Sequence, residues 1–370
     1  MSGPSDEDAP SLAQLAAEPW SVAELAVPTT VSASPEHDRG APDDPSSGAP
    51  VLLVGCSFDV HLDLIARELA KRRIETVRVD IDAAAGPGRW AAIQRLAGRG
   101  PFAAGVCRSI DLVHPLAVHG RRTALRAEPW AAVDPFVRSF AGEQLQQALL
   151  GWLDECEVGT WINDPWTIPR AEIKARQLRL AASSGLAVPR TLITDDAAAV
   201  RELATSCEGG IVYKGLADPF VWRDGDDAGF LYTTPMTASL LDGLDTTLVH
   251  PGIFQERLHP IAELRATVVG DDVFVARVAH GPRPELDWRR DMPGGSATRR
   301  AALPPETIDG VVETVRRLGL RYGAVDLVDT SDGIVFLEVN PSGAYSWLEA
   351  ALALPITATI CDHLVPPAEI

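Results

Sequence analysis

Oxygen-bearing side chains interrupt a strongly apolar hairpin near the end of the chain. Residues 336–343, FLEVNPSG, place Glu338 and Asn340 among residues that suit a buried strand, and alternate side chains of a strand point to the same face. The strand before it contains Asp326, which we predict to lie opposite about Phe336, one step from Glu338 on that face. Three hard oxygen ligands would then converge, as Mg²⁺ prefers, with phosphate oxygens and water completing its shell.

Each of these residues also has an ordinary structural interpretation. Asp326 can cap a turn, Glu338 can pair with an arginine, and Asn340 followed by Pro341 can open a turn. Taken singly, these ordinary interpretations are the better ones. Further residues that could bind a nucleotide weaken them when the whole set is considered.

Two lysines and one strand favour a nucleotide beside the oxygen ligands. Lys174 lies in an otherwise apolar and arginine-bearing helix, and Lys214 ends a strand in IVYKG, where the following glycine does not crowd the lysine stem. Residues 254–258, FQERL, form an apolar strand with a polar interruption, which suits an adenine edge held by backbone groups. The pattern therefore predicts a nucleotide bound together with a divalent cation.

The first part of the chain has the pattern of a strand–helix–strand unit. Residues 51–54 are an apolar run typical of a buried strand, Asp59 can cap a helix with apolar residues at helical spacing, and residues 76–81 form a second strand. A unit of this length predicts a parallel sheet. The intervening loop lacks a GxGxxG fingerprint, so dinucleotide binding is not supported.

The second part of the chain has the pattern of two sets of strands with helices between them, after a connector at residues 161–169. The elements that we predict are a helix over 131–152, a helix over 171–184 that ends at Gly185, strands over 188–193 and 209–215, a helix capped by Asp195, a flexible loop over 216–230, a hairpin around Gly270 and Asp271 within 252–279, a helix over 304–318 and a last helix after the final hairpin.

The composition excludes several classes of protein. The chain has 370 residues and a net charge of −18, which argues against nucleic-acid binding because phosphate contacts need a basic surface. No apolar run could cross a bilayer and no signal peptide is evident, so we expect no membrane association. Five scattered cysteines without a CxxC pair favour reduced thiols and a cytoplasmic location over a disulfide framework or a zinc site.

Much of the acidic charge is concentrated at the start of the chain. Residues 1–50 contain nine acidic residues and one arginine and are dense in Pro, Ser, Ala and Gly, a composition that cannot offset the entropy of ordering. We therefore predict a disordered acidic tail over residues 1–49. Residues 11–27 have enough Leu, Val and Trp to dock on another surface, although a solvated tail is the simpler interpretation.

An ordered set of motifs resembles the ATP-grasp ligases. The segments IKARQLRLAASSGLAVPRTLIT, IVYKG, FQERL, ELRATVVGDDVFVAR, DWRR…GG and GAVDLV…FLEVNPSG occur in that family's order across residues 160–353. Within the superfamily the chain looks like the ribosomal-peptide maturases, the graspetide synthetases related to microviridin ligases, and next like ligases that add glutamate to ribosomal protein S6. Two departures are an acidic loop, Asp218–Gly229, and Ala344-Tyr345 after NPSG, where microviridin-type enzymes usually have Gln-Trp.

The resemblance implies a role for each matching residue. Lys174 and Lys214 would hold phosphates; Gln255, Glu256, Arg257 and Leu258 would form the adenine hinge; Glu263 would contact the ribose; Asp326, Glu338 and Asn340 would bind Mg²⁺, with Glu338 bridging two ions; and Arg265, Arg277 and Arg289 would lie near the γ-phosphate and the acyl phosphate.

The resemblance also implies the fold and the function. We expect an α/β protein with the disordered tail, a parallel-sheet pre-ATP-grasp domain over 50–158, and a two-lobed ATP-grasp fold over 159–250 and 251–370. The expected activity is ATP-dependent activation of Asp or Glu side chains of a precursor peptide with a leader segment, followed by linkage to Ser, Thr or Lys side chains. The alternatives are a ligase that adds a free amino acid, such as glutamate, and a non-catalytic ATP-binding module. A homodimer is left open.

Overall fold

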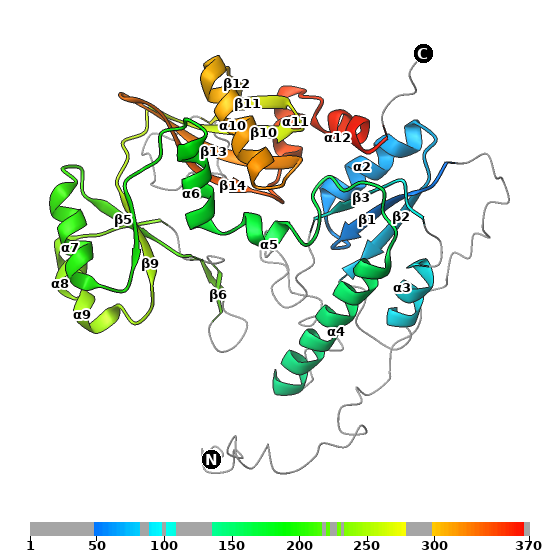
Figure 1. Ribbon diagram of the computed structural model, residues 1–370, viewed down its shortest axis with the longest axis horizontal. Coiled ribbons are helices and arrows are strands. Elements are labelled where there is room, and N and C mark those ends of the chain that lie inside the picture. Colours follow the sequence, from blue (N-terminus) through cyan, green and yellow to red (C-terminus); the bar gives the residue numbers. More distant parts are fainter. Residues whose placement is uncertain are drawn as a thin grey trace, which may run out of the picture.

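The computed structural model describes the greater part of the chain. The described residues are 48–81, 89–97, 101–108, 135–216, 220–222, 228–230, 233–278 and 298–365. Residues 1–47 of the predicted disordered tail and Arg289 lie outside the described residues. In Figure 1 the described elements form three parts in a row, with the first domain at one end and a small sheet at the other.

The first part is built on a three-stranded parallel sheet with strand order β2-β1-β3, which confirms the predicted strand–helix–strand unit. The Asp59 side chain accepts a hydrogen bond from the amide of His61 and caps helix α2, also as predicted. Leu62, Ile65 and Leu69 of this helix are buried. The elements are β1 (Val51–Gly55), α2 (Val60–Lys71), β2 (Thr76–Asp80), α3 (Arg89–Ala97), β3 (Ala104–Cys107) and α4 (Pro135–Glu155).

The small sheet at the other end is antiparallel, with order β4-β9-β5-β8. The prediction that Asp195 caps the following helix is wrong: the helix begins one residue later, and Asp196 accepts hydrogen bonds from the amides of Ala198 and Ala199. Residues 216–230 are more than a loop, because they contain the short β6–β7 hairpin. The elements are β4 (Thr191–Thr194), α7 (Ala197–Ser206), β5 (Ile211–Lys214), β6 (Phe220–Trp222), β7 (Ala228–Phe230), β8 (Thr234–Pro235), α8 (Ala238–Asp242), α9 (Leu244–Thr247) and β9 (Gly252–Glu256).

The central part is a five-stranded antiparallel sheet with order β12-β11-β10-β13-β14. One face packs on helices α6 and α10 around a core that includes Leu264, Leu327 and Phe336. The predicted turn at Gly270 is confirmed, and its φ of +61° is the left-handed conformation that glycine adopts readily. The elements are α5 (Ile168–Ala171), α6 (Lys174–Ser183), β10 (Ala262–Val269), β11 (Asp272–Val278), β12 (Thr298–Arg300), α10 (Pro305–Arg317), β13 (Tyr322–Thr330) and β14 (Gly333–Asn340).

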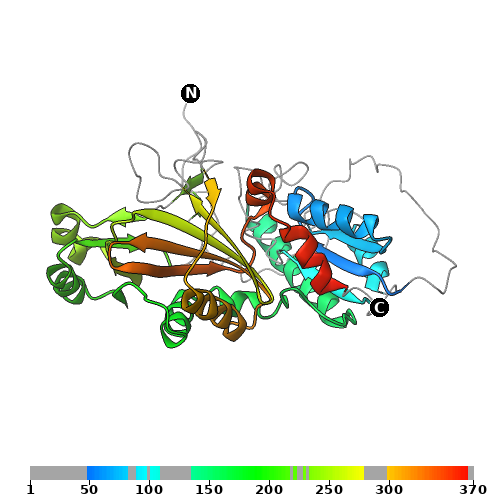
Figure 2. The same cartoon turned by 90° about the horizontal axis from the view of Figure 1, so that it is seen from above.

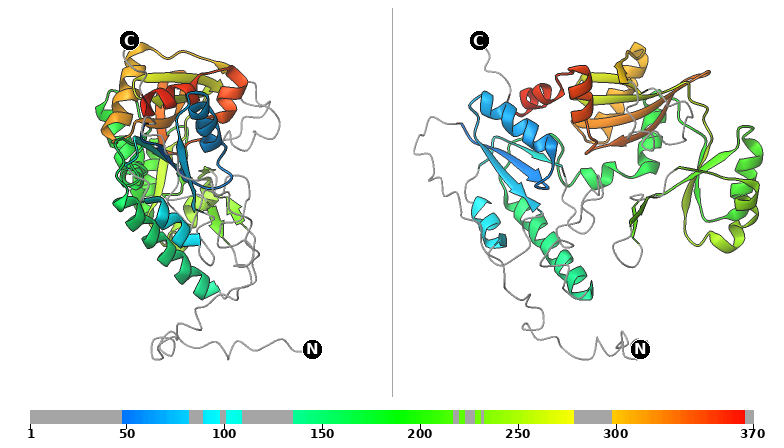
Figure 3. Two further views of the ribbon diagram at one scale, coloured as in Figure 1. Left: turned by 90° about the vertical axis from the view of Figure 1, so that its right-hand side faces the viewer. Right: turned by 180° about the vertical axis from the view of Figure 1, so that it is seen from behind.

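Two final helices, α11 (Ser346–Leu352) and α12 (Ile356–Leu364), join the central sheet to the first domain. Figure 2 shows both helices between the central sheet and helix α2, and the view from behind in Figure 3 agrees. One continuous apolar core contains Leu62 of the first domain, Tyr322 of the central sheet and Ile360 of α12. The end of β14 therefore lies close to the first domain.

Within the described residues, none of the helices combines the length and the apolar composition needed to span a bilayer. All five cysteines are free thiols, as predicted. Burial raises the pKa of the Cys361 thiol to about 12 and that of Cys156 to about 11, so these two side chains are poor nucleophiles near neutral pH.

Candidate functional site

A β-bulge brings the two candidate carboxylates into direct opposition. Leu327 pairs with Phe336, but the preceding residue of β13, Asp326, pairs with Glu338, so that Leu337 is the extra residue. The predicted partner of Asp326, Phe336, is therefore wrong by two positions. The bulge keeps Phe336 in the apolar core while it turns Glu338 to the opposite face of the sheet.

Each carboxylate has a cationic neighbour. Arg265 Nη1 donates to Asp326 Oδ1 at 2.6 Å, and both side chains are buried. Lys174 Nζ donates to Glu338 Oε2 at 2.8 Å, and these two side chains are each 27% exposed. Strand pairing aligns Arg265 with Asp326, whereas Lys174 reaches Glu338 from the first residue of helix α6, which packs along edge strand β14.

Asn340 is the last residue of β14 and follows Glu338 on the same face. It pairs with Ala324, two residues from Asp326 on β13. Its Oδ1 accepts a hydrogen bond from the amide of Ser342 at 2.9 Å, which fixes the side chain against the start of the following loop. The structure thus gathers Asp326, Glu338 and Asn340 on one sheet face.

The donor chemistry of this face fits a hard divalent cation. Mg²⁺ is usually bound by one or two carboxylates together with substrate phosphates and water, and Asp326 and Glu338 are two carboxylates in register. Among the described residues no three His, Cys, Asp or Glu side chains form a metal-binding group. A metal at this face would therefore rely on the two carboxylates, the Asn340 amide and ligands from outside the chain.

The candidate nucleotide-binding residues lie on two sheets. Lys214 ends β5 in the small sheet, and Gln255 and Glu256 end the adjacent strand β9. The backbone amides of Glu256 and Arg257 donate to the carbonyls of Arg190 and Gly210. The side-chain Nε2 of Gln255 donates to Thr191 Oγ1 at 2.9 Å. Leu258 is the second residue after β9, and buried Glu263 lies on β10 on the same face as Arg265.

Arg277 is not brought to this face. It pairs with Leu264, whose side chain belongs to the core on the helix-covered face, so the two-residue alternation of strands directs Arg277 to that face as well. Its Nη1 lies 3.2 Å from Asp329 Oδ2. Of the two described arginines predicted near the phosphates, only Arg265 shares a face with Asp326 and Glu338.

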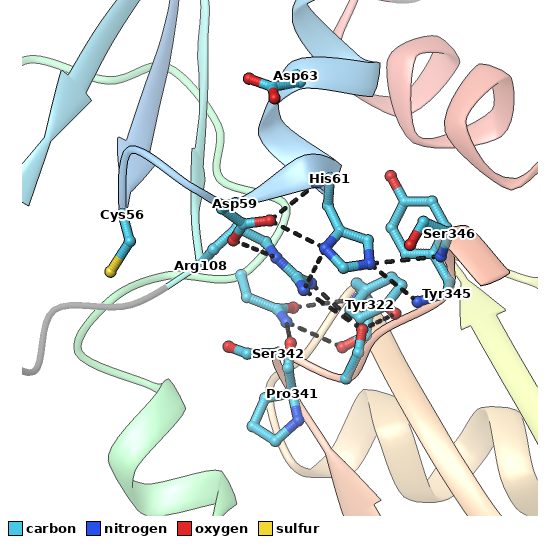
Figure 4. A network of polar contacts seen from close by, with 12 residues as sticks. Cys56, Asp59, His61, Asp63, Arg108, Tyr322, Pro341, Ser342, Tyr345 and Ser346 are labelled. Carbon is cyan, nitrogen blue, oxygen red and sulfur yellow. Dashed lines mark hydrogen bonds and ion pairs between the residues drawn. The ribbon is translucent and has the colours of Figure 1, made fainter. Parts of the chain in front are cut away.

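A network that the sequence did not predict lies just beyond Asn340 (Figure 4). His61 Nδ1 lies 2.9 Å from Asp59 Oδ1, and Arg108 Nε lies 3.3 Å from Asp59 Oδ2. Burial and the Arg108 charge lower the pKa of His61 below its ordinary 6.5, against the opposing effect of Asp59. Burial alone would raise the pKa of Asp59, but Arg108 and the hydrogen bonds with His61 hold it well below its ordinary range.

Comparison with known proteins identifies the second half of the chain. Residues 171–364 match the RimK-like ATP-grasp domain. A probable alpha-L-glutamate ligase of Chromohalobacter salexigens is 25% identical over 206 residues, which are 55% of this chain and 66% of that protein. The match therefore spans about two thirds of that relative's length.

Solved structures that resemble the chain cover most of its length. Macrocyclase MdnB from Microcystis aeruginosa is 26% identical, with a TM-score of 0.65 over 86% of this chain and all of that one. An ATP-grasp ligase of Chryseobacterium gregarium, solved with ADP and with a leader and core peptide, is 19% identical, with a TM-score of 0.70 over 87% of this chain and 98% of that one. The latter likeness concerns the fold alone.

Proposed function

The chain belongs to the RimK-like ATP-grasp family, and from that premise we propose that it is an ATP-dependent, ADP-forming ligase that crosslinks the side chains of a ribosomally made precursor peptide. The observation that carries this proposal is the pairing of Asp326 with Glu338 beside Arg265 and Lys174. Two carboxylates on one sheet face, each paired with a cationic side chain, suit a metal–triphosphate ligand. The likeness to macrocyclase MdnB supports a peptide as the substrate.

The reaction requires an activated carboxyl group. A carboxylate oxygen of a peptide Asp or Glu attacks the γ-phosphorus of ATP, the bond to the β,γ-bridging oxygen breaks, and ADP leaves. A Ser or Thr hydroxyl, or a Lys amine, then attacks the acyl carbon, phosphate leaves, and the nucleophile loses its proton. Each ester or amide link therefore removes one water from the peptide, and each consumes one ATP.

The side chains of this enzyme bind and orient the reactants. We propose that Lys174 and Lys214 hold the phosphates and that Arg265 stabilises the charge that develops on the acyl group. Bound Mg²⁺, which we propose as two ions, would neutralise phosphate charge during transfer. We assign the remaining roles to the adenine-contacting segment Gln255–Leu258, to Glu263 at the ribose, and to Asp326, Glu338 and Asn340 as the metal ligands, whereas Arg289 stays a prediction.

A second candidate is a ligase that adds a free amino acid. The match to a probable alpha-L-glutamate ligase favours it, and the same face would serve because both reactions activate a carboxylate. A non-catalytic ATP-binding module has less use for paired carboxylates. We also propose a cytoplasmic location, in keeping with free thiols.

Mass spectrometry of a peptide encoded beside the gene separates these candidates. The protein is incubated with ATP, Mg²⁺ and the peptide, and ADP is measured in parallel. Loss of one water mass per link, together with ADP release, supports the proposal. Gain of an amino-acid residue when free glutamate is supplied would favour the second candidate, and nucleotide binding without ADP release would favour the non-catalytic module. Light scattering of the same sample tests for a homodimer.

A further inference from the structure

Side chains from elsewhere in the chain form hydrogen bonds with most backbone peptide groups of the loop after Asn340. This loop, residues 341–346, runs from the end of β14 through the first residue of helix α11. Its partners come from the first domain, from the connector before α5, and from β13 (Figure 4). None of them belongs to the residues proposed above for the nucleotide or the metal.

His61 caps helix α11 from another domain. Tyr345, at the N-cap position, makes no capping hydrogen bond with its own side chain. Instead His61 Nε2 accepts hydrogen bonds from the amides of Tyr345 at 3.1 Å and Ser346 at 3.3 Å. Because Nε2 accepts, the proton of the neutral ring is on Nδ1, which donates to Asp59 Oδ1 at 2.9 Å. The buried carboxylate therefore fixes the tautomer that can cap the helix.

Two carbonyl groups of the loop are held in the same way. The Gly343 carbonyl accepts from Tyr322 Oη at 2.6 Å and from Arg108 Nη1 at 3.4 Å. The Pro341 carbonyl accepts a hydrogen bond from Asn163 Nδ2 at 2.8 Å. The same Asn163 side chain also donates to the Tyr322 carbonyl through Nδ2 and accepts from the Tyr322 amide through Oδ1. The cavity enclosed by these side chains is about 10 Å³, which is the room that one water needs. The network is therefore too closely packed to be a ligand site of its own.

The position of the loop bears directly on Asn340 and Arg265. Asn340 Oδ1 accepts from the amide of Ser342. A Cβ at Gly343 would lie 2.6 Å from Arg265 Nη2 and would overlap the side chain of Ala324, so the glycine backbone rests against the guanidinium group. A shift of the loop would move the Asn340 amide and release Arg265 from one side.

We propose that His61, Arg108 and Asn163 are positioning residues for the metal–nucleotide site, acting through residues 341–346 on Asn340 and Arg265. This inference rests on the proposed function, because it takes Asn340 as a metal ligand. Stability alone does not call for such a network, since a buried ion pair such as Arg108 with Asp59 can often be replaced as a whole by apolar residues without loss. Partners of metal ligands typically change metal affinity by about 10-fold to 100-fold when they are removed.

Binding of Mn²⁺ in the presence of ADP, followed by electron paramagnetic resonance, tests the proposal without a peptide. We expect His61→Leu and Arg108→Met to weaken Mn²⁺ about tenfold or more, and His61→Gln, which keeps an acceptor, to restore part of the loss. Tyr322→Phe is a milder variant that removes one donor to Gly343 and serves if the larger changes prevent folding. The matched control is Arg72→Met, because Arg72 also joins the first domain to α12 but does not touch the loop.

The outcomes are distinct. If the wild-type protein does not bind Mn²⁺ with ADP, the proposed function itself fails. If the wild type binds and folded His61, Arg108 and Tyr322 variants bind equally well, the positioning role is refuted. Equal weakening in Arg72→Met would also refute it, because general loosening between the domains would then explain the effect.

Discussion

Glu338 is the side chain on which the proposed metal site depends most directly, because it faces Asp326 and contacts Lys174. Glu338→Gln keeps the volume and removes the charge. We expect the affinity for ADP in the presence of Mg²⁺ to fall about tenfold or more, whereas the affinity without Mg²⁺ stays within about twofold. Calorimetry with both conditions measures this difference.

The matched control for Glu338 is Asp332→Asn. Asp332 is an exposed carboxylate in the turn of the same hairpin, so its loss changes the local charge without changing the site. A Mg²⁺ effect equal in the two variants would contradict the assignment of Glu338, because a general charge effect would account for it.

Thr267 allows a prediction of increased stability, because its substitution should raise the free energy of unfolding. It is fully buried on β10, and its hydroxyl has no hydrogen-bond partner in the structure as described. A buried hydroxyl without a partner costs about 1 to 3 kcal/mol, so we expect Thr267→Val to stabilise the fold by about 1 kcal/mol and to raise the melting temperature.

Thr314 is the natural comparison for Thr267. It is equally buried, but its hydroxyl donates to the Gly310 carbonyl at 2.7 Å. Thr314→Val should lower the melting temperature, since it removes a satisfied hydrogen bond. If both variants shift the temperature in the same direction, the difference in hydrogen bonding does not control stability at these sites.

For single residues, the sequence predicts which side chains share the site face better than it predicts which side chains they contact. The two-residue period of a strand places Glu338 and Asn340 on one face from the sequence alone. It does not reveal that Lys174, 164 positions away, reaches Glu338, or that Arg277 pairs with Leu264 and so faces the helices. Those facts depend on helix docking and on strand register.

Among the elements, the β13–β14 hairpin shows why register is difficult to predict. A single extra residue, Leu337, changes the partner of Asp326, and no residue type in FLEVNPSG marks that position. Most strands and helices were predicted because their apolar periodicity is strong. The helix start at Asp196 was missed by one residue because two adjacent aspartates are equally good caps.

One side chain of helix α6, that of Gln177, hydrogen-bonds to the backbone of edge strand β14. Gln177 Nε2 donates to the Val339 carbonyl at 2.7 Å, and its Oε1 accepts from the Val339 amide at 3.0 Å. Gln177→Leu would leave both buried backbone groups unpaired, at about 1 to 3 kcal/mol each. We expect a lower melting temperature and faster hydrogen exchange over residues 334–340.

Ser183→Ala at the other end of α6 is the control for Gln177. Its hydroxyl bonds at the exposed end of the helix and does not reach β14, so exchange in β14 should stay as in the wild type. Unchanged exchange of residues 334–340 in Gln177→Leu would show that α6 does not hold the strand that carries Glu338 and Asn340.

For the whole molecule, the α/β fold class was predictable from the sequence, but the junction between the first domain and the central sheet was not. The parallel-sheet unit and the two later sheets follow from local patterns, but the sequence analysis gave the first domain no role beyond the absence of a dinucleotide-binding fingerprint. Arg108 and Gly343 are 235 positions apart, and His61 and Tyr345 are 284 apart. An isolated histidine or arginine gives no sign of such a partner, because only the folded chain brings them together.

The junction makes the stability of the molecule depend on pH. Above His61's ordinary pKa of 6.5 the imidazole is neutral in the folded and unfolded chain. Below 6.5 the unfolded chain takes up a proton, while the folded chain resists it because burial and Arg108 lower the pKa, so stability falls as the pH falls. Protonation would also remove the Nε2 acceptor that caps α11. Asp59 does not vary in this range, since its stabilising charge is complete above its ordinary pKa of 3.8.

Melting temperatures of the wild type and of His61→Gln, recorded between about pH 7.5 and pH 5.5, isolate this contribution. The groups that face His61 are Asp59 and Arg108 from its own domain and Tyr345 from the loop, and all three are present in both proteins. We expect the wild type to lose more stability than the variant over this range, because glutamine takes up no proton. Parallel curves would mean that His61 keeps an ordinary pKa in the folded protein, and that the cap on α11 does not depend on a neutral ring.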